Sequence, residues 1–290
     1  MPVTRSQAAR WTRIPLAGGG QETLLSEVGF VLLPLFSTTD ACALRLVCRE
    51  FLAVVSEHPW EDRGTVIKGS IAAWRTCFSR ACCANVQKWV FPDGPNKRAS
   101  PVVDADFVHF EGLRELYMAF CQDVTDAAFV HLRGIHTLDM SGCWQLAITD
   151  AAFAHLAGIQ RLSIWGCMQA TITDSAFAHL RGIQMLNMSE CNQLTDAAFV
   201  HLRGIHTLYM WFCDQPAISD SAFVHLRGIH TLVLDSCRQA TITGVTFPSL
   251  KGASLLGMHD CSAAAIAAAQ GLGLPVRTEC GGLGNLSYLL

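Results

Sequence analysis

Two side-chain types that can ligate metals or act as nucleophiles recur through the middle and end of this chain. One row consists of histidines: His131, His155, His179, His201 and His225. The other row consists of cysteines: Cys121, Cys143, Cys167, Cys191, Cys213, Cys237 and Cys261. Imidazoles of neighbouring copies could share a zinc ion, and a thiol beside an imidazole could act as a nucleophile. Both kinds of chemistry depend on the elements that hold the rows in place.

The spacing within the two rows favours packing over chemistry. The histidine row lacks the close Cys or His spacing that is typical of a zinc site. A thiol and an imidazole copied in every repeat indicate packing, because a nucleophile needs one oriented pair in one cleft. We interpret the histidines as a solvated row and the cysteines as buried, reduced thiols. We expect neither enzymatic activity nor a metal or cofactor.

Both rows belong to an internal repeat. The string FVHLRGIHTL occurs three times, beginning at Phe129, Phe199 and Phe223. Phenylalanines at the equivalent place in each repeat are 22 or 24 residues apart: Phe107, Phe129, Phe153, Phe177, Phe199, Phe223 and Phe247. A period of this size is typical of a solenoid, in which every repeat packs on its neighbours. The copied residues are therefore predicted to form the packing side.

Each repeat is predicted to contain one strand and one short helix. Alternation in the stretch LDMSGC places Leu138 and Met140 on one face of a strand. In the stretch TDAAFVHLRG, Thr125 or Asp126 can cap a helix that Gly134 can end. Such a helix is too short to be stable alone, so its apolar face must pack on its strand and on neighbouring repeats.

Charged residues fall at the two ends of these short helices. Aspartates stand at the starts: Asp126, Asp150, Asp174, Asp196 and Asp220. Arginines stand at the ends: Arg133, Arg181, Arg203 and Arg227. Each sign suits the helix dipole, so we interpret these charges as structural.

The spacing L-x-x-L-x-L-x-x-C can be read at Ile135, Leu138, Met140 and Cys143. With it, the sequence resembles leucine-rich repeats of the cysteine-containing type over residues 86–261, if Val86 to Phe91 is a degenerate first strand. The resemblance implies an α/β solenoid with short parallel strands on the concave side and short helices outside. The repeats are shorter than usual for that type and lack its second cysteine. The near-verbatim copies also resemble multicopy repeat proteins of giant DNA viruses.

Positions that flank the inward pair of each strand differ from repeat to repeat, while their surroundings are copied. Large aromatic side chains among them are predicted to be exposed on the concave side, which favours a protein-binding surface. The alternative is that a terminal segment covers some of them. The predicted target-binding residues are Tyr117, Asp139, Arg161, Trp165, Asn187, Tyr209, Trp211 and Asp235.

A segment without the repeat period precedes the solenoid. A helix is predicted from Asp40, capped by Thr39 or Asp40, because apolar residues then recur at steps of three and four. The segment resembles an F-box, whose pattern is matched by Leu24, Glu27, Leu32, Asp40, Val47, Cys48 and Trp60. Leu25, Ala41 and Phe51 depart from that pattern. The resemblance implies docking on the adaptor subunit of a cullin ligase.

These two resemblances together imply a substrate-recognition subunit of a cullin-type, SCF-like ubiquitin ligase. The residues expected to bind the adaptor are Leu24, Leu25, Glu27, Leu32 and Leu35. The alternative is an interaction scaffold with a degenerate, non-functional F-box. The expected organisation is a tail at 1–20, an F-box-like module at 21–62, a connecting helix and N-terminal cap at 63–85, repeats at 86–261 and a C-terminal cap at 262–290.

The composition narrows the classes of function and the cellular locations that remain. A net charge of -3 with 16% charged residues gives no general attraction to nucleic acid or to an anionic membrane. Thirteen cysteines without a signal peptide favour reduced thiols in the cytoplasm or nucleus, of a host cell if the protein is viral. The arginine-containing stretch from Met1 to Gln21 could instead be a transit segment.

Overall fold

The structure, a computed structural model, describes residues 32–46, 49–90, 94–95 and 101–279. The chain divides into two compact units after Asn85. We call the described residues up to Asn85 the helical module and those from Val86 onward the repeat module. Among the described residues, no helix has the length and apolar character that crossing a bilayer requires.

The helical module contains a few short elements around one small core. They are η1 (Leu33–Leu35), α3 (Thr38–Leu44), α4 (Arg49–Glu57), α5 (Ile71–Cys77) and β1 (Cys83–Asn85). The Trp60 ring is buried against Phe78, with ring centroids 5.6 Å apart, and its indole Nε1 donates to the Val55 carbonyl at 2.8 Å. Residues predicted as a connecting segment therefore contribute Phe78 to the same core as Trp60.

The start of α3 differs from the sequence prediction. Ser37 is the N-cap: its Oγ accepts from the Asp40 backbone N–H, while Asp40 Oδ2 accepts from the Ser37 N–H. The prediction of a cap at Thr39 or Asp40 was wrong because Asp40 is the third helical residue of this reciprocal capping box. The single helix expected from Asp40 is also interrupted, since α3 ends at Leu44 and α4 begins at Arg49.

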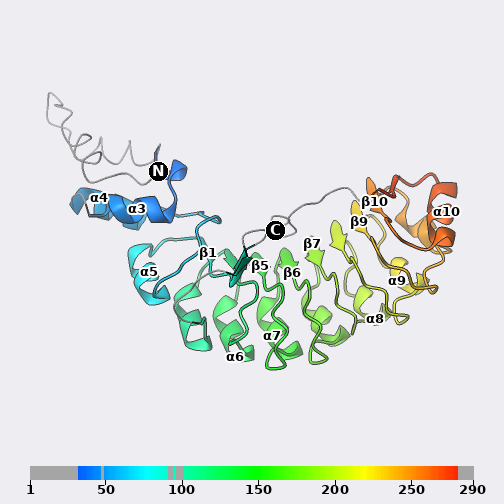
Figure 1. Cartoon of the computed structure of the whole chain (residues 1–290), viewed down its shortest axis with the longest axis horizontal. Coiled ribbons are helices and arrows are strands. Elements are labelled where there is room, and N and C mark those ends of the chain that lie inside the picture. Colours follow the sequence, from blue (N-terminus) through cyan, green and yellow to red (C-terminus); the bar gives the residue numbers. More distant parts are fainter. Residues whose placement is uncertain (1–31, 47–48, 91–93, 96–100, 280–290) are drawn as a thin grey trace. The chain divides into compact units, whose positions relative to one another are not determined.

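The repeat module is a leucine-rich repeat solenoid (Figure 1). Its strands pair in parallel and in chain order: β4 (Glu115–Tyr117), β5 (Thr137–Asp139), β6 (Arg161–Ser163), β7 (Met185–Asn187), β8 (Thr207–Tyr209), β9 (Thr231–Val233), β10 (Leu255–Gly257) and β11 (Val276–Arg277). They line the concave side of the module, and the short helices lie on the outer side. The predicted fold class is therefore confirmed.

The outer side consists of short helices of three to seven residues. Short α-helices are α6 (Asp126–Phe129), α7 (Asp150–Phe153), α8 (Asp196–Phe199) and α9 (Asp220–Phe223). 3-10 turns are η2 (Asp104–Phe110), η3 (Val130–Leu132), η4 (Ala154–Leu156), η5 (Asp174–His179) and η6 (Phe247–Leu250). The described elements also include a closing helix, α10 (Ala263–Gly271), which begins after the N-cap Ser262 and lies within the expected C-terminal cap.

The copied apolar residues form one continuous core between the two sides. All seven phenylalanines of the repeat are fully buried, as are the central strand leucines such as Leu138 and Leu162. Rings of neighbouring repeats touch edge to face, with centroids 6.4 Å apart for Phe199–Phe223 and 5.4 Å apart for Phe223–Phe247. Each repeat thus buries its aromatic ring only because its neighbours are present.

The aspartates at the helix starts do more than complement a dipole. The Asp150 carboxylate accepts two hydrogen bonds from the next repeat, from Thr173 N at 2.7 Å and Thr173 Oγ1 at 2.6 Å. The Thr173 hydroxyl then caps η5 by accepting from Ser175 N. The same link recurs between Asp104 and Thr125, Asp126 and Thr149, Asp174 and Thr195, Asp196 and Ser219, and Asp220 and Thr243. This aspartate ladder joins each helix start to the preceding repeat.

The cysteines form a second ladder between repeats. Each thiol lies near a backbone carbonyl of the preceding repeat, as Cys167 Sγ does at 3.3 Å from Met140 O and Cys191 Sγ at 3.1 Å from Ile164 O. Two residues after each of five cysteines, a glutamine amide donates to the carbonyl of the preceding cysteine: Gln145, Gln169, Gln193, Gln215 and Gln239. The cysteine row is therefore part of the packing between repeats.

The first edge of the repeat module differs in detail from the prediction. Val86 N donates to Tyr117 O and Lys88 N donates to Ala119 O, so the chain runs along β4 there. The expected first strand is not one continuous element in the described residues, because β2 (Trp89–Val90) pairs in antiparallel fashion with β3 (Gly94–Pro95). Phe91, the predicted end of that strand, lies outside the described residues.

Candidate protein-binding surface

The strand register places one variable position of each repeat in a line across the concave side. Leu116, Leu138 and Leu162 pair with one another and point into the core. The residues after them form a row on the opposite face: Tyr117, Asp139, Ser163, Asn187, Tyr209, Val233 and Gly257. Side chains alternate along a strand, so this row must face away from the core.

This row of concave strand residues is far less exposed than the sequence predicted. The exposed fraction is 5% for Tyr117 and 7% for Tyr209, so the expectation that these two aromatics are exposed is wrong. The Tyr117 hydroxyl donates to Glu115 Oε2 of the same strand at 3.1 Å.

Asp139 and Asn187 are also buried, against expectation. Asp139 Oδ1 accepts from the Ser141 backbone N–H at 3.0 Å and from the Ser141 hydroxyl at 2.5 Å. Burial raises the pKa of the Asp139 carboxyl, and the two bonds from Ser141 oppose that effect. Asn187 Oδ1 accepts from Ser189 N at 3.1 Å in the same way. Both side chains fix the turn after their strand and offer little surface to a partner.

Trp165 and Trp211 remain partly exposed, as does Arg161. Trp165 belongs to an aromatic cluster with Phe120 and Trp144 that the sequence did not predict as a unit. The Phe120 ring meets Trp144 edge to face with centroids 6.0 Å apart, and it meets Trp165 in the same manner at 6.1 Å. Three consecutive repeats thus contribute one aromatic side chain each to a single patch.

The residue before each ladder cysteine has a left-handed backbone conformation. Glycine occupies this place at Gly142 and Gly166, with φ of 65° and 69°. The other five repeats carry side chains there at φ of 53° to 62°: Phe120, Glu190, Phe212, Ser236 and Asp260. Bulky residues rarely adopt this conformation, and strain of this kind often marks functional positions. Phe120 and Phe212 are thereby held at the rim of the concave side.

An exposed apolar rim continues from these residues. Trp144 and Met168, each directly after a ladder cysteine, are exposed, and so are Leu146 and Phe212. Sequence reasoning missed Trp144 and Met168 because it followed only the strands. The signal was available, since the residue after each cysteine also varies between repeats: Gln122, Trp144, Met168, Asn192, Asp214, Arg238 and Ser262.

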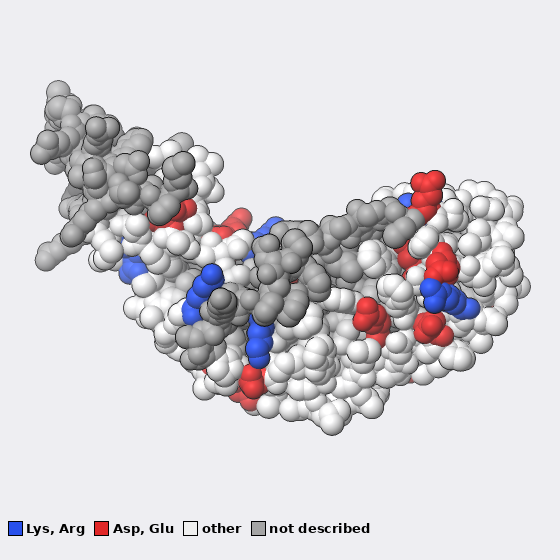
Figure 2. All heavy atoms as spheres, viewed as in Figure 1, with Lys and Arg blue, Asp and Glu red and all other residues white. Residues whose placement is uncertain are grey.

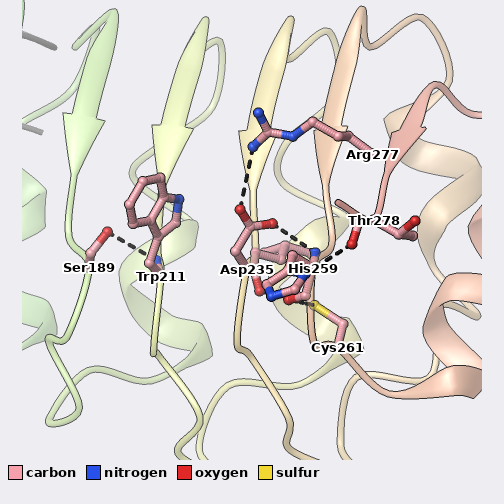
Figure 3. Close-up of polar contacts among 8 residues, drawn as sticks. Ser189, Trp211, Asp235, His259, Cys261, Arg277 and Thr278 are labelled. Carbon is pink, nitrogen blue, oxygen red and sulfur yellow. Dashed lines mark hydrogen bonds and ion pairs between the residues drawn. The ribbon is translucent and has the colours of Figure 1, made fainter. Parts of the chain in front are cut away.

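Polar residues gather at the C-terminal end of the concave side (Figure 3). Arg277 Nη2 lies 3.4 Å from Asp235 Oδ2, and Asp235 Oδ1 accepts from His259 N at 2.8 Å. The His259 imidazole Nδ1 lies 2.9 Å from the Thr278 carbonyl oxygen. Asp235 was predicted from the sequence, whereas Arg277 was missed because it follows the last copied repeat.

The histidine row lies on the outer side, apart from the aromatic surface. His131 Nδ1 lies 2.6 Å from Glu111 Oε1, and Arg133 Nε donates to His155 Nδ1 at 3.4 Å. Burial and the neighbouring Arg203 lower the pKa of His225, while Asp196 opposes them. Within the described part of the chain, no three His, Cys, Asp or Glu side chains come together in a way that could hold a metal ion.

Three of the five expected adaptor-binding residues lie outside the described residues: Leu24, Leu25 and Glu27. Leu35 has an exposed fraction of 78%, whereas Leu32 is half-buried. Leu46, which the sequence reasoning did not select, is 82% exposed. Exposed leucines are candidates for contact with another protein.

Charges are sparse on the face that Figure 2 shows, and near the C-terminal end both signs lie close together. In the last repeats, the guanidinium of Arg238 is paired with Asp260. Intermixed signs give no continuous basic track of the kind that binds nucleic acid. Local contacts must therefore provide any recognition by this surface.

Comparisons with known proteins found no family model and no curated protein sequence that matches this chain. Solved structures with similar folds include the yeast Rad7–Elc1 complex, at 17% identity and a TM-score of 0.39, which matches 61% of this chain and 44% of that one. The TLR13–ssRNA13 complex has 14% identity and a TM-score of 0.48, with 70% and 33% covered. The mouse RP105/MD-1 complex has 13% identity and a TM-score of 0.41, with 73% and 45% covered.

The chain thus spans less than half the length of each of these structures.

Proposed function

We propose that the chain is the substrate-recognition subunit of a cullin-type ubiquitin ligase. The repeat module would hold a target protein on its concave side and rim, and the helical module would dock on the adaptor subunit. Catalysis would come from placing the target near a ubiquitin-loaded enzyme, with no reactive side chain of this chain taking part.

The observation that carries the target-binding half is where the repeats differ. Core residues such as Phe153 and Phe199 are copied and fully buried. The large side chains that are not copied gather on the concave side and rim, in the cluster of Phe120, Trp144 and Trp165. Partly exposed tryptophans are the residues that most often dominate binding energy at protein interfaces. This contrast supports a binding surface carried by a uniform scaffold.

The adaptor-binding half rests on the F-box resemblance and on exposed leucines. Leu35 and Leu46 project from a helical module whose own core is small. Exposed leucines on so small a module favour contact with a partner. The loop after α4 is held independently of them, because Asp62 accepts from Thr38 N at 2.6 Å and from Thr65 N at 3.1 Å. A substitution at Leu35 should therefore leave this part of the module folded.

Calorimetric titration of the full chain with the purified adaptor subunit tests the proposal. Binding at micromolar concentration or tighter is expected, and Leu35→Asp should weaken it at least about tenfold by placing a charge in an apolar contact. Leu272→Asp is the matched control, because Leu272 is also an exposed leucine, with an exposed fraction of 46%, but belongs to the repeat module. Its affinity should be that of the unchanged chain.

Absence of adaptor binding at micromolar concentration would reject the ligase assignment. The chain would then act as an interaction scaffold with a non-functional F-box. A Leu272→Asp variant that loses binding as fully as Leu35→Asp would reject the proposed docking surface.

A further inference from the structure

The missing side chain at Gly257 of β10 leaves room for the Arg277 side chain to cross that strand. Gly257 pairs with Val233 of β9 and with Arg277 of β11. A Cβ atom at residue 257 would lie 2.9 Å from Val233 Cγ1 and 3.0 Å from Asp235 Oδ1, so this place accommodates no side chain. The Arg277 side chain therefore crosses β10 and meets Asp235, two strands away (Figure 3).

Asp235 holds the Arg277 guanidinium from one side only. The single contact between them, at 3.4 Å, involves Arg277 Nη2. Arg277 Nε is buried and has no hydrogen-bond partner. A guanidinium has five N–H donors and no acceptor, so the group remains able to bind a further anionic oxygen.

Trp211 adds a second unpaired donor on the same side of the sheet. Its backbone N–H donates to Ser189 Oγ at 3.0 Å, which fixes the start of the turn. Its indole Nε1 is buried without an acceptor. In Figure 3 this nitrogen lies on the side of the ring that faces β9 and Asp235. A buried donor without an acceptor costs about 1–3 kcal/mol, which an incoming acceptor would recover.

Tyr209 is a further polar residue on this part of the concave side. Burial raises the pKa of the Tyr209 phenol, and the positive charges of Arg161 and Arg277 oppose this effect. Tyr209 stands two residues before Trp211, so their side chains lie on the same face of the sheet. The Asp235 carboxylate is already engaged, because Oδ1 accepts from His259 N and Oδ2 contacts Arg277.

We propose that Trp211 and Arg277, together with the Tyr209 hydroxyl, bind the carboxylate of an aspartate or glutamate side chain of the target protein. A carboxylate offers two oxygens and about four lone-pair sites, and it matches planar guanidinium donors. The inference rests on the proposed function in that it assumes a target on the concave side, and it names one chemical feature of that target.

Nuclear magnetic resonance of the full chain with ¹⁵N-labelled tryptophan tests this without knowledge of the target. The probe is the peptide acetyl-Ala-Ala-Glu-Ala-Ala-amide, and the matched peptide carries Gln in place of Glu. The Trp211 indole resonance, assigned by Trp211→Phe, should shift saturably with the Glu peptide and not with the Gln peptide. Arg277→Gln should abolish that shift, whereas Arg181→Gln, an exposed arginine on the outer side, should retain it.

Equal shifts with both peptides, or no shift with either, would overturn the proposal. A larger shift with inorganic phosphate than with the Glu peptide at equal concentration would also overturn it, since the site would then suit a phosphate group. The probe requires neither the adaptor nor the natural target. A failure here is therefore distinguishable from a failure of adaptor binding.

Discussion

Arg277 and Asp235 contact each other across a strand to which neither belongs, with Arg277 Nη2 3.4 Å from Asp235 Oδ2. The intervening strand β10 contributes Gly257 at the crossing point. The arrangement depends on the missing side chain at that glycine. It joins the last strand of the solenoid to the body of the sheet through side chains as well as through the backbone.

Gly257→Ala should disturb this crossing. The new Cβ would lie 3.0 Å from Asp235 Oδ1, so the carboxylate would have to move away. Overpacking of this kind costs about 1–3 kcal/mol of the free energy of unfolding. Thermal unfolding should show the loss, whereas the control Gly271→Ala, whose Cβ would meet nothing within 4 Å, should be neutral or slightly stabilising. Equal melting temperatures for the two variants would contradict this account.

The aspartate ladder predicts that Asp150→Ala destabilises the solenoid. The substitution removes two hydrogen bonds to a charged acceptor, from Thr173 N and Thr173 Oγ1. A loss of about 1–2 kcal/mol is expected because these bonds are partly open to solvent. Asp123→Ala is the control, since it removes only an ion pair with Lys88 at 4.0 Å and should cost less than about 0.5 kcal/mol. Chemical denaturation of the two variants measures the difference, and equal losses would count against the ladder.

The close approach of the Phe120 ring to Gly142 predicts that substitutions at these two positions have coupled effects on stability. A Cβ at residue 142 would lie 2.4 Å from Phe120 Cε1, so Gly142→Ala should force the ring out of the aromatic cluster. Its cost, from this clash and from the left-handed backbone, is expected to be about 1–3 kcal/mol. In the Phe120→Ala background the clash disappears, and Gly142→Ala should cost markedly less. A double-mutant cycle measures this coupling, and strictly additive losses would show that the ring does not rest on Gly142.

The cysteine ladder predicts unfolding at alkaline pH. Burial raises the pKa of Cys167 and Cys213 from the ordinary thiol value of 9.0 to about 12. A group whose pKa is raised in the folded state contributes stability below the unfolded pKa and loses it as the pH rises toward the folded value. The melting temperature should therefore fall between about pH 9 and pH 12. A melting temperature that stays constant up to pH 11 would contradict the burial of these thiols.

The cysteine ladder also leads to a prediction about the oxidation state of the cysteines. All thirteen cysteines are predicted to be reduced in the native protein. Each ladder thiol is directed at a carbonyl oxygen of the preceding repeat, as Cys143 Sγ is at 3.4 Å from Met118 O, and such packing favours a thiol over a disulfide. Mass spectrometry of alkylated native protein measures this. Several native disulfides would reject both the reduced state and the expected cytoplasmic or nuclear location.

The periodic part of the fold could be predicted from the sequence, because copies of one pattern must share one packing solution. The spacing of Phe153, Leu162 and Cys167 within one repeat was enough to predict an inward-facing strand, a short helix and a buried thiol. The role of Asp150 was only half predicted. Its place at a helix start is local information, whereas its bonds to Thr173 depend on how one repeat sits on the next.

The candidate site was harder to predict, because exposure depends on neighbours. Alternation correctly placed Tyr117 and Tyr209 on the concave face, but it could not predict that both are almost fully buried there. Arg277 lies beyond the last repeat, so no copied pattern pointed to it. Its role follows from Gly257, whose missing side chain has meaning only in the assembled sheet.

The central claim is that the concave side and rim, and not the copied core, hold the partner. Partner capture by the full chain, measured by quantitative mass spectrometry beside thermal unfolding, tests it with three double variants. Val200→Ala with Val224→Ala, on the exposed outer side, should change neither property. Phe153→Ala with Phe199→Ala should lower stability by about 3–5 kcal/mol for each buried ring.

The third double variant, Trp165→Ala with Trp211→Ala, tests the binding surface directly. This pair should remove most of the partners that the unchanged chain captures, while its melting temperature stays close to that of the valine control. The opposite result would contradict the account: a tryptophan pair that captures the same partners as the unchanged chain, or that melts the protein while the phenylalanine pair leaves it folded.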